Sequence, residues 1–377
     1  MLRHCSLRVE GLESRLTPAD VAVVNAEMLT PTSVRFTYQT TDDPGPFTVR
    51  VHRSADPNFD ASDPLWGTTV ITAPSAPGGS TATITLSGQL PLNPARPYVL
   101  VVADPANAIP ETDEGNNVSL FRKLALGVVT HGFQPGGVIA SWVDAMTAAL
   151  EAKGYAETIA YDWASDSLQP VSGMTVKHGT LMAEQIRQTA DAIGTLPNDV
   201  VDLHLIGHSR GAVVISQAAL ALNANPGPRE LQVGYLKMTL LDPHPARNRG
   251  SLFAGLLELS NGTGRSMIGG FSFDPGNALS MSTAVAQLQF QAAVNDPRVV
   301  IPANVDLAES YYQRLAWYQT TTPFEQELRF NIWGDLPQEI VNLSAGPLLA
   351  TNLAAVPGAT TVGHTAVQFW YLGTLLA

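Results

Sequence analysis

Asp199-Val-Val-Asp-Leu-His-Leu-Ile-Gly-His-Ser-Arg-Gly211 carries an apolar, strand-like run directly into a Gly-x-Ser-x-Gly motif, and a helical pattern follows over residues 212–222. A strand, a sharp turn and a helix in this order hold the motif's serine, Ser209, in a strained backbone conformation that only small neighbours such as glycine allow. The turn lifts the Ser209 hydroxyl clear of the sheet. It also places the N–H group of Arg210 at a helix N-terminus, where developing negative charge is stabilised. The stretch therefore predicts a nucleophilic serine, with an ordinary strand-to-helix turn as the alternative interpretation.

Around this motif, residues 124–377 alternate predicted strands and helices. Leu124–Thr130 is apolar throughout, as strands of buried parallel sheets are. Further strands are predicted at residues 155–163, 232–241 and 328–333, and further helices at residues 138–153, 178–193 and 280–294. Alternation of this kind predicts a parallel sheet covered by helices on both faces. Together with the Ser209 turn it predicts an α/β-hydrolase domain.

A serine hydroxyl is a poor nucleophile unless a histidine takes its proton and a carboxylate orients that histidine. In the α/β-hydrolase fold the chain order is serine, acid, histidine. Only His244 and His364 follow Ser209. His364 lies after the last predicted strand and before a C-terminal amphipathic pattern, where the loop that carries the base belongs. We therefore predict His364 as the general base, with a surface-loop histidine as the alternative.

Two carboxylates compete for the role of the acid. Asp242 directly follows the predicted strand at residues 232–241, in Leu-Asp-Pro-His-Pro, and Asp335 follows the one at residues 328–333. Both positions lie at the C-terminal end of a strand, where open α/β sheets place their sites. The commonest hydrolase position favours Asp335, whereas the local sequence favours Asp242. We predict Asp242 as the acid and keep Asp335 as the alternative.

An oxyanion hole needs two backbone donors. Arg210 N–H supplies one, and the loop after an early strand supplies the other. The segment His131-Gly-Phe-Gln-Pro-Gly-Gly137 has the glycine-rich form of such a loop. We predict Phe133 as its donor residue and His131 as an organiser of the loop, with a structural turn as the alternative. Trp163, at the end of the predicted strand at residues 155–163, is expected at the same edge of the sheet as Ser209 and is a candidate for the substrate pocket.

Four features occur in the order found in lipase-like α/β-hydrolases, which residues 124–377 resemble: His131-Gly-Phe, the Gly-His-Ser-Arg-Gly motif, Leu241-Asp-Pro and His364. The Leu-Asp-Pro element resembles the acid of pancreatic-type lipases. The resemblance implies hydrolysis of small-molecule or lipid esters. One departure is Arg210, which stands where those lipases carry Leu, Met or Gln and predicts a more polar entrance to the site.

Residues 248–277 form a long insertion of glycines, aromatic and aliphatic residues after Asp242. Segments of this length are often lids or binding loops. A lid suited to acyl chains and a helix pair packed on the sheet are equally compatible with the pattern. The polar and aromatic residues 305–312 are expected to form a loop near the site.

Residues 20–123 have an all-β pattern, with short strands separated by Thr, Pro, Gly and Asp clusters, which suggests an immunoglobulin-like sandwich. Its end, Asp104-Pro-Ala-Asn-Ala-Ile-Pro-Glu-Thr-Asp-Glu-Gly-Asn-Asn117, resembles the closing signature of the bacterial cell-adhesion-related sandwich family. The resemblance implies contact with a cell surface or polymer. The acidic and amide side chains of this end are expected to shape a corner by bonding nearby backbone.

Residues 1–19 lack the apolar core of a secretory signal. They contain Val9-Glu-Gly-Leu-Glu-Ser-Arg-Leu-Thr-Pro-Ala19, which resembles a short N-terminal signature of surface and secreted proteins in one bacterial group. A secreted or cell-surface location follows from that resemblance, by a route that the sequence does not define. A basic, disordered leader is the alternative.

Composition excludes several classes of function. The 377 residues carry a net charge of −12, which argues against a nucleic-acid partner. Cys5 is the single cysteine, so neither an intrachain disulfide nor a cysteine-based zinc site is expected. No apolar run approaches the ~18–20 residues of a membrane span. No phosphate-binding loop, dinucleotide motif or histidine pair at metal spacing is present, so we predict no cofactor and no metal.

The sequence predicts a serine hydrolase of carboxylic esters, a lipase or esterase, that works by a Ser-His-Asp acyl-enzyme mechanism. Two alternatives remain open at this point. One is a serine peptidase or amidase with the same triad. The other is a non-catalytic surface adhesion or binding protein that uses the hydrolase fold as a scaffold.

Overall fold

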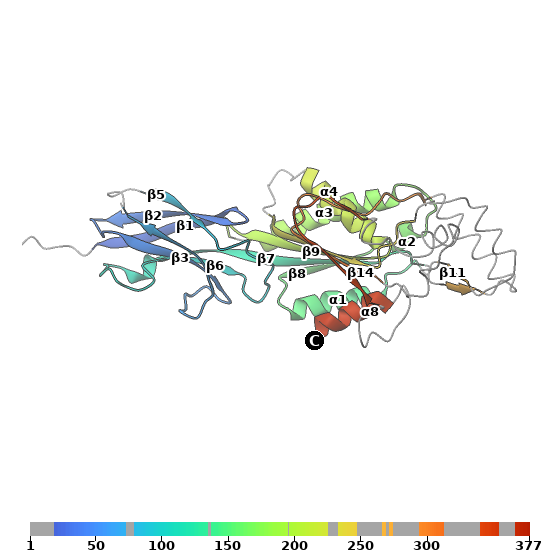
Figure 1. The fold of residues 1–377 in the computed structure, drawn as a ribbon, viewed down its shortest axis with the longest axis horizontal. Coiled ribbons are helices and arrows are strands. Elements are labelled where there is room, and N and C mark those ends of the chain that lie inside the picture. The colour runs from blue at the N-terminus through green and yellow to red at the C-terminus, as the bar shows by residue number, and fades with distance from the viewer. Residues whose placement is uncertain are drawn as a thin grey trace, which may run out of the picture. The chain divides into compact units, whose positions relative to one another are not determined.

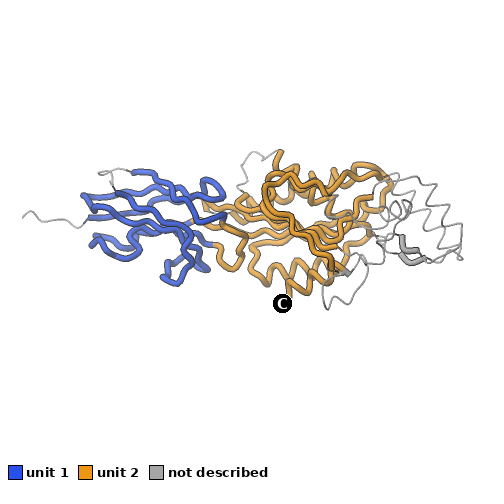
Figure 2. The backbone as a smooth tube through the Cα atoms, in the orientation of Figure 1, with its two compact units in different colours: residues 1–89, 98–120 blue, residues 90–97, 121–377 orange. Residues whose placement is uncertain are grey.

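The computed structural model describes residues 19–72, 79–134, 137–194, 196–224, 233–246, 294–312, 340–353 and 366–377, and the backbone of residues 266–268 and 271–273. The chain divides into two compact units, shown in Figure 2: unit 1 holds residues 1–89 and 98–120, and unit 2 holds residues 90–97 and 121–377. The sequence places the change of pattern at Leu124, a few residues after this division.

Unit 1 is built from strands in the residues described. One antiparallel sheet has the order β1 (Asp20–Thr30), β2 (Ser33–Thr41), β5 (Ser80–Thr85). A second group places β3 (Phe47–Ser54) between β4 (Leu65–Ile71) and β6 (Tyr98–Ala103), again antiparallel. Burial alternates along β2, where Val34 and Phe36 are fully buried, as a half-buried strand requires. The immunoglobulin-like assignment stays a prediction.

The polar end of unit 1 forms a corner held by side chain to backbone bonds. Asp104 has a φ of +36°, and its carboxylate accepts from Ile109 N at 2.7 Å. Asp113 caps the 3-10 turn η1 (Glu114–Asn116) by accepting from Gly115 N at 2.8 Å. These short-range bonds are the ones expected of aspartates in turns. Among the described residues, no group of three or more His, Cys, Asp or Glu side chains forms a metal site.

Unit 2 contains a parallel sheet with the order β16-β14-β10-β9-β7-β8. Its strands are β7 (Val118–Thr130), β8 (Glu157–Tyr161), β9 (Val200–His208), β10 (Val233–Leu241), β14 (Leu307–Tyr312) and β16 (Leu348–Asn352). The expectation of a loop at residues 305–312 is wrong, since Leu307–Tyr312 form β14, which pairs with β10 from Leu307 to Tyr311. A short pair, β13 (Val300–Ile301) with β15 (Val341–Asn342), lies apart from this sheet.

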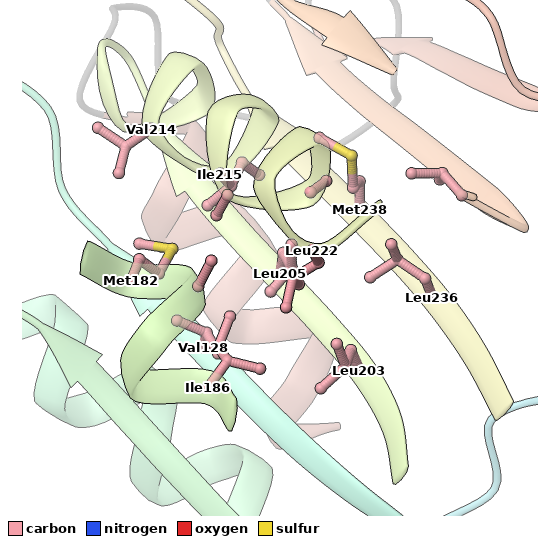
Figure 3. Close-up of a cluster of buried hydrophobic side chains, with 14 of the residues drawn as sticks. Val128, Met182, Ile186, Leu203, Leu205, Val214, Ile215, Leu222, Leu236 and Met238 are labelled. Carbon is pink, nitrogen blue, oxygen red and sulfur yellow. The ribbon is translucent and has the colours of Figure 1, made fainter. Parts of the chain in front are cut away.

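Helices cover both faces of the parallel sheet (Figure 1). The pair α3 (Met174–Ile193) and α4 (Gly211–Ala224) packs on one face, and α1 (Ser141–Ala152) and α8 (Ala366–Leu376) pack on the other. Because successive side chains of a strand point to opposite faces, β9 contributes to both cores. Its Leu203 and Leu205 join the α3/α4 core shown in Figure 3, whereas Ile206 joins the α1/α8 core.

The α/β prediction for residues 124–377 agrees with this sheet and its helical layers. The predicted helix at 280–294 except for Val294, the strand at 328–333 and most of the insertion at 248–277 lie outside the described residues. Within the insertion, the backbone of β11 (Ser266–Ile268) pairs antiparallel with β12 (Phe271–Phe273). None of the described helices has both the length and the apolar character needed to cross a membrane.

Candidate active site

The turn at residues 207–211, here called the elbow, connects the end of β9 to the start of α4. Ser209 has a φ of +57°, a region that non-glycine residues enter only at a cost. A Cβ atom at Gly207 would lie 2.5 Å from Gly211 O, and one at Gly211 would lie 2.5 Å from His131 O. Any larger residue at either position would collide with backbone. The elbow therefore needs both glycines of the motif, as the sequence predicts.

The loop after β7 lies directly against the elbow. A Cβ atom at Gly132 would stand 2.5 Å from Ser209 Cβ, 2.9 Å from Ser209 Oγ and 3.0 Å from Arg210 N. Gly132 therefore lies so close to the hydroxyl and to the first predicted oxyanion donor that no side chain fits between them. Phe133 follows at once, with its side chain 38% exposed. The structure brings Ser209, Arg210 and this loop together, and donation by Phe133 N–H stays a prediction.

His131 organises this loop from beneath. Its side chain is fully buried, with Nδ1 2.9 Å from Gly132 O and Nε2 3.2 Å from an Asp162 carboxylate oxygen. The indole Nε1 of Trp163 donates to His131 O at 2.8 Å, and the two rings stack with centroids 6.0 Å apart. Trp163 is itself only 2% exposed. This position makes it a support for the loop, and its predicted role in the substrate pocket stays untested.

Asp242 lies at the end of β10 beside the elbow. Leu241, directly before it, and His244, two residues after it, bond the backbone of Ser209: Ser209 N donates to Leu241 O at 3.0 Å, and His244 N donates to Ser209 O at 3.1 Å. Asp242 is 5% exposed and has a φ of +44°, a second left-handed residue next to the first. Strained backbone of this kind gathers at functional sites. The structure places Asp242 next to Ser209, and its role as the acid that orients the histidine stays a prediction.

The other two predicted residues, Asp335 and His364, lie outside the described residues. The case for Asp335 depended on a strand at residues 328–333, one strand later than β10. The strand that follows β10 in the sheet is β14, which ends at Tyr312, well before Asp335. His364 precedes α8, which packs with α1 on the face of the sheet that also buries Ile206 and Leu241.

The Arg210 side chain does not face a polar entrance, and that expectation is wrong. Its guanidinium is 3% exposed and forms a bidentate pair with Asp296, with Nε 2.7 Å and Nη2 3.0 Å from the two carboxylate oxygens. Nη1 donates to Ser167 O at 2.8 Å, and the group lies over the Trp163 ring at 5.0 Å. A buried arginine requires a carboxylate partner. Sequence patterns could not show which carboxylate, because Asp296 lies far along the chain.

A second histidine lies behind Trp163. His178 contacts the Trp163 ring with centroids 5.5 Å apart, and its Nε2 is 2.9 Å from an Asp166 carboxylate oxygen. Burial lowers the pKa of His178 from its usual 6.5, and the Asp166 carboxylate opposes that shift. Tyr161, whose hydroxyl is 2.9 Å from His178 Nδ1, has a pKa raised to about 12 by burial. His178, Tyr161 and Asp166 therefore form a hydrogen-bonded group against the Trp163 ring.

No protein-family model and no curated protein matches the sequence. Among solved structures, the chain is similar to RedJ, a thioesterase of prodiginine biosynthesis in Streptomyces coelicolor, at 14% identity over 67% of this chain and 86% of that one, with a TM-score of 0.31. It is also similar to YbtT, a type II thioesterase of yersiniabactin biosynthesis, at 16% identity over 67% of this chain and 89% of that one, with a TM-score of 0.29. A domain described as part of a cell-surface protein of Methanosarcina acetivorans is 17% identical to this chain. The match covers 28% of this chain and 89% of that domain, with a TM-score of 0.22. Because these scores are low, we argue function from the site itself.

Proposed function

We propose that this protein is a serine hydrolase that cleaves carboxylic esters through an acyl-enzyme. The observation that carries the proposal is the close approach of Gly132 to Ser209 Oγ and Arg210 N, which leaves no room there even for a Cβ atom. A left-handed serine between a strand and a helix, with a glycine loop against its hydroxyl and the next N–H group, is the arrangement that acyl transfer needs. A plain structural turn has no need of such a loop.

In the proposed mechanism, Ser209 Oγ attacks the ester carbonyl carbon while His364 takes the hydroxyl proton. The carbonyl oxygen becomes an oxyanion, and the N–H groups of Arg210 and Phe133 stabilise it. His364 then gives the proton to the departing alcohol, which leaves an ester on Ser209. Water attacks this ester with His364 as base and releases the acid. Asp242 orients His364 throughout.

The location of Arg210 N supports its part in this mechanism. It is the residue directly before α4, so its N–H group lies at the positive end of a helix of three turns or more. Its side chain is neutralised by Asp296, so the stabilisation offered to an oxyanion comes from the N–H group and the helix dipole. This arrangement does not depend on the alkyl or acyl part of the substrate.

The residues of the proposed mechanism do not by themselves define which type of bond is cleaved. The same residues can attack an amide or a thioester, so a peptidase or amidase is the closest alternative. The exposed Phe133 side chain offers an apolar surface beside the elbow, which favours an acyl group over a charged peptide. We therefore place esters first.

The test is labelling of purified protein with a fluorophosphonate, which reacts with activated serines, alongside p-nitrophenyl esters of increasing chain length and matched anilides. We expect label on Ser209, ester turnover, and loss of both in the Ser209→Ala variant. Folded wild-type protein that takes no label would contradict the enzyme proposal and favour a non-catalytic scaffold. Turnover of anilides alone would favour the amidase.

We also propose that the protein acts outside the cell or at its surface, with unit 1 as the part that contacts a surface or polymer. Support comes from the resemblances at residues 9–19 and 104–117, given above. Binding of isolated cell-wall polymers by the full-length Ser209→Ala variant tests this location without depending on catalysis, and a lack of binding would contradict it.

A further inference from the structure

Arg210 joins segments that lie far apart in the sequence. Beyond the bidentate pair with Asp296, its Nη1 bonds the carbonyl oxygen of Ser167 on the short helix α2 (Ala164–Ser167). Both members of the pair are buried, at 3% and 0% side-chain exposure. A guanidinium fork fixes direction as well as distance, because its donors lie in one plane. The backbone N–H of Arg210 is a predicted oxyanion donor, so the bonds of the guanidinium fix the position of the residue that carries this donor.

Asp296 uses its remaining bonds to hold the segment that follows Asp242. One carboxylate oxygen also accepts from Ala246 N at 2.9 Å, and Asp296 N donates to Ala246 O at 2.7 Å. The other oxygen also accepts from the Thr175 hydroxyl at 3.1 Å, at the start of α3. The preceding residue, Asn295, has a φ of +42°. Asparagine tolerates this conformation better than most residues. The chain therefore bends to present Asp296 to three partners at once.

Ser167 extends the same network to the loop after β7. Its hydroxyl accepts from Gln134 N at 3.1 Å and donates to Ala164 O at 2.7 Å. Gln134 follows Phe133, the predicted second donor. The Arg210 side chain thus connects, through one residue on each side, the loop of Phe133 and the segment after Asp242.

From this network we propose that Arg210, through its side chain, and Asp296 are positioning residues, which hold the two oxyanion donors and the acid segment in register with Ser209. The proposal rests on the proposed function. A buried ion pair is weak evidence of a contribution to stability, because an apolar pair of similar volume often stabilises a core as well. What an apolar pair lacks is the set of directed bonds to Ser167, Ala246 and Thr175.

The experiment separates positioning from packing by a double replacement. We expect Arg210→Met and Asp296→Leu each to lower the Tm, because each leaves a buried charge without its partner. The double variant regains much of the Tm. Its kcat for p-nitrophenyl esters is nevertheless expected to fall about 10- to 100-fold with KM nearly unchanged, since oxyanion bonds form only in the transition state.

A matched control lies in the same sheet. Lys123 and Asp202 form a second buried pair, with Nζ and a carboxylate oxygen 2.6 Å apart and side chains 0% and 1% exposed. The pair lies where β7 and β9 begin to pair, and the elbow follows the other end of this pairing. We expect Lys123→Met with Asp202→Leu to leave kcat within about twofold of wild type, because this pair lies at the opposite end of those strands from Ser209.

Arg210→Lys gives a second measurement, which does not depend on whether the double variant folds. It keeps the charge and loses the fork, so we expect a folded protein with a lowered kcat and an unchanged KM. Wild-type kcat in both the double variant and Arg210→Lys would overturn the positioning proposal. Failure of the wild-type protein itself to label or turn over would instead overturn the proposed function, so the two failures are distinguishable.

Discussion

Replacement of Gly132 by alanine tests the central contact of the site. The added methyl carbon would lie 2.5 Å from Ser209 Cβ and 2.9 Å from Ser209 Oγ. Carbon atoms rest at roughly 3.5–4.0 Å, so the contact is short by about 1 Å. Ser209 cannot yield easily, because its N and O atoms are bonded to Leu241 and His244. The loop of residues 131–134 must therefore move away from the elbow.

The size of the effect follows from that displacement. A shift of about 1 Å in a catalytic group can cost on the order of 100-fold in rate. Overpacking in a well-packed region costs about 1–3 kcal/mol of stability. We therefore expect Gly132→Ala to fold with a lowered Tm, and its rate of fluorophosphonate labelling and its kcat/KM for esters to fall about 100-fold.

The matched control is Gly373→Ala in α8, where nothing lies within 4 Å of the added methyl carbon. Alanine is a better helix former than glycine by about 1 kcal/mol, so this variant should keep full activity and gain slightly in Tm. Labelling and Tm are measured on all three proteins in parallel. A Gly132→Ala protein with labelling within threefold of wild type would refute the close approach of this loop to Ser209.

The remaining predictions concern the acid, the elbow and pH. We expect Asp242→Asn to reduce kcat by about 10⁴-fold, the order seen when a triad carboxylate is neutralised, and Asp335→Asn to reduce it far less; equal losses would remove the preference for Asp242. We expect Gly211→Ala to abolish labelling and lower the Tm, because its methyl carbon would stand 2.5 Å from His131 O; circular dichroism checks that the chain still folds. Burial lowers the pKa of His204 well below 6.5, so the unfolded chain binds more protons than the folded one below pH 6.5, and stability is lost as the pH falls through that range. One such group changes the free energy of unfolding by up to about 1.4 kcal/mol per pH unit, and the decline in Tm between pH 7 and pH 5 should be shallower in His204→Gln.

Periodicity in the sequence was sufficient for the strands and helices that have one simple environment. The run at Leu124–Thr130 is apolar throughout because β7 is covered on both faces there, and it was predicted within the observed strand. The elbow was predictable for a different reason: only glycine fits at residues 207 and 211, so the backbone geometry leaves a signature in the sequence. The same holds for Gly132.

The misassigned strand shows where periodicity fails. β14 has the sequence Leu-Ala-Glu-Ser-Tyr-Tyr, and it looked like a loop because it is polar. In the sheet, Ala308 and Ser310 are fully buried, while Glu309 lies 3.0 Å from the Lys237 ammonium group on β10. Small buried residues and a cross-strand ion pair replace the usual apolar alternation. That pairing depends on which strand is the neighbour of β14 in the sheet, and a single sequence does not predict this.

Arg210 places a positive charge at the elbow, directly before α4. A guanidinium close to the N-terminus of a helix is unfavourable, because that end already carries positive partial charge. In this protein the charge is cancelled within 2.7–3.0 Å by Asp296, and it is turned away from solvent against Trp163. The arginine therefore adds no net charge beside Ser209, and its presence does not imply an anionic substrate. What it adds is a planar set of donors whose partners lie on α2 and on the segment before β13. A residue that looks like a specificity determinant in the sequence is therefore better explained by the positioning that we propose for the predicted oxyanion donors.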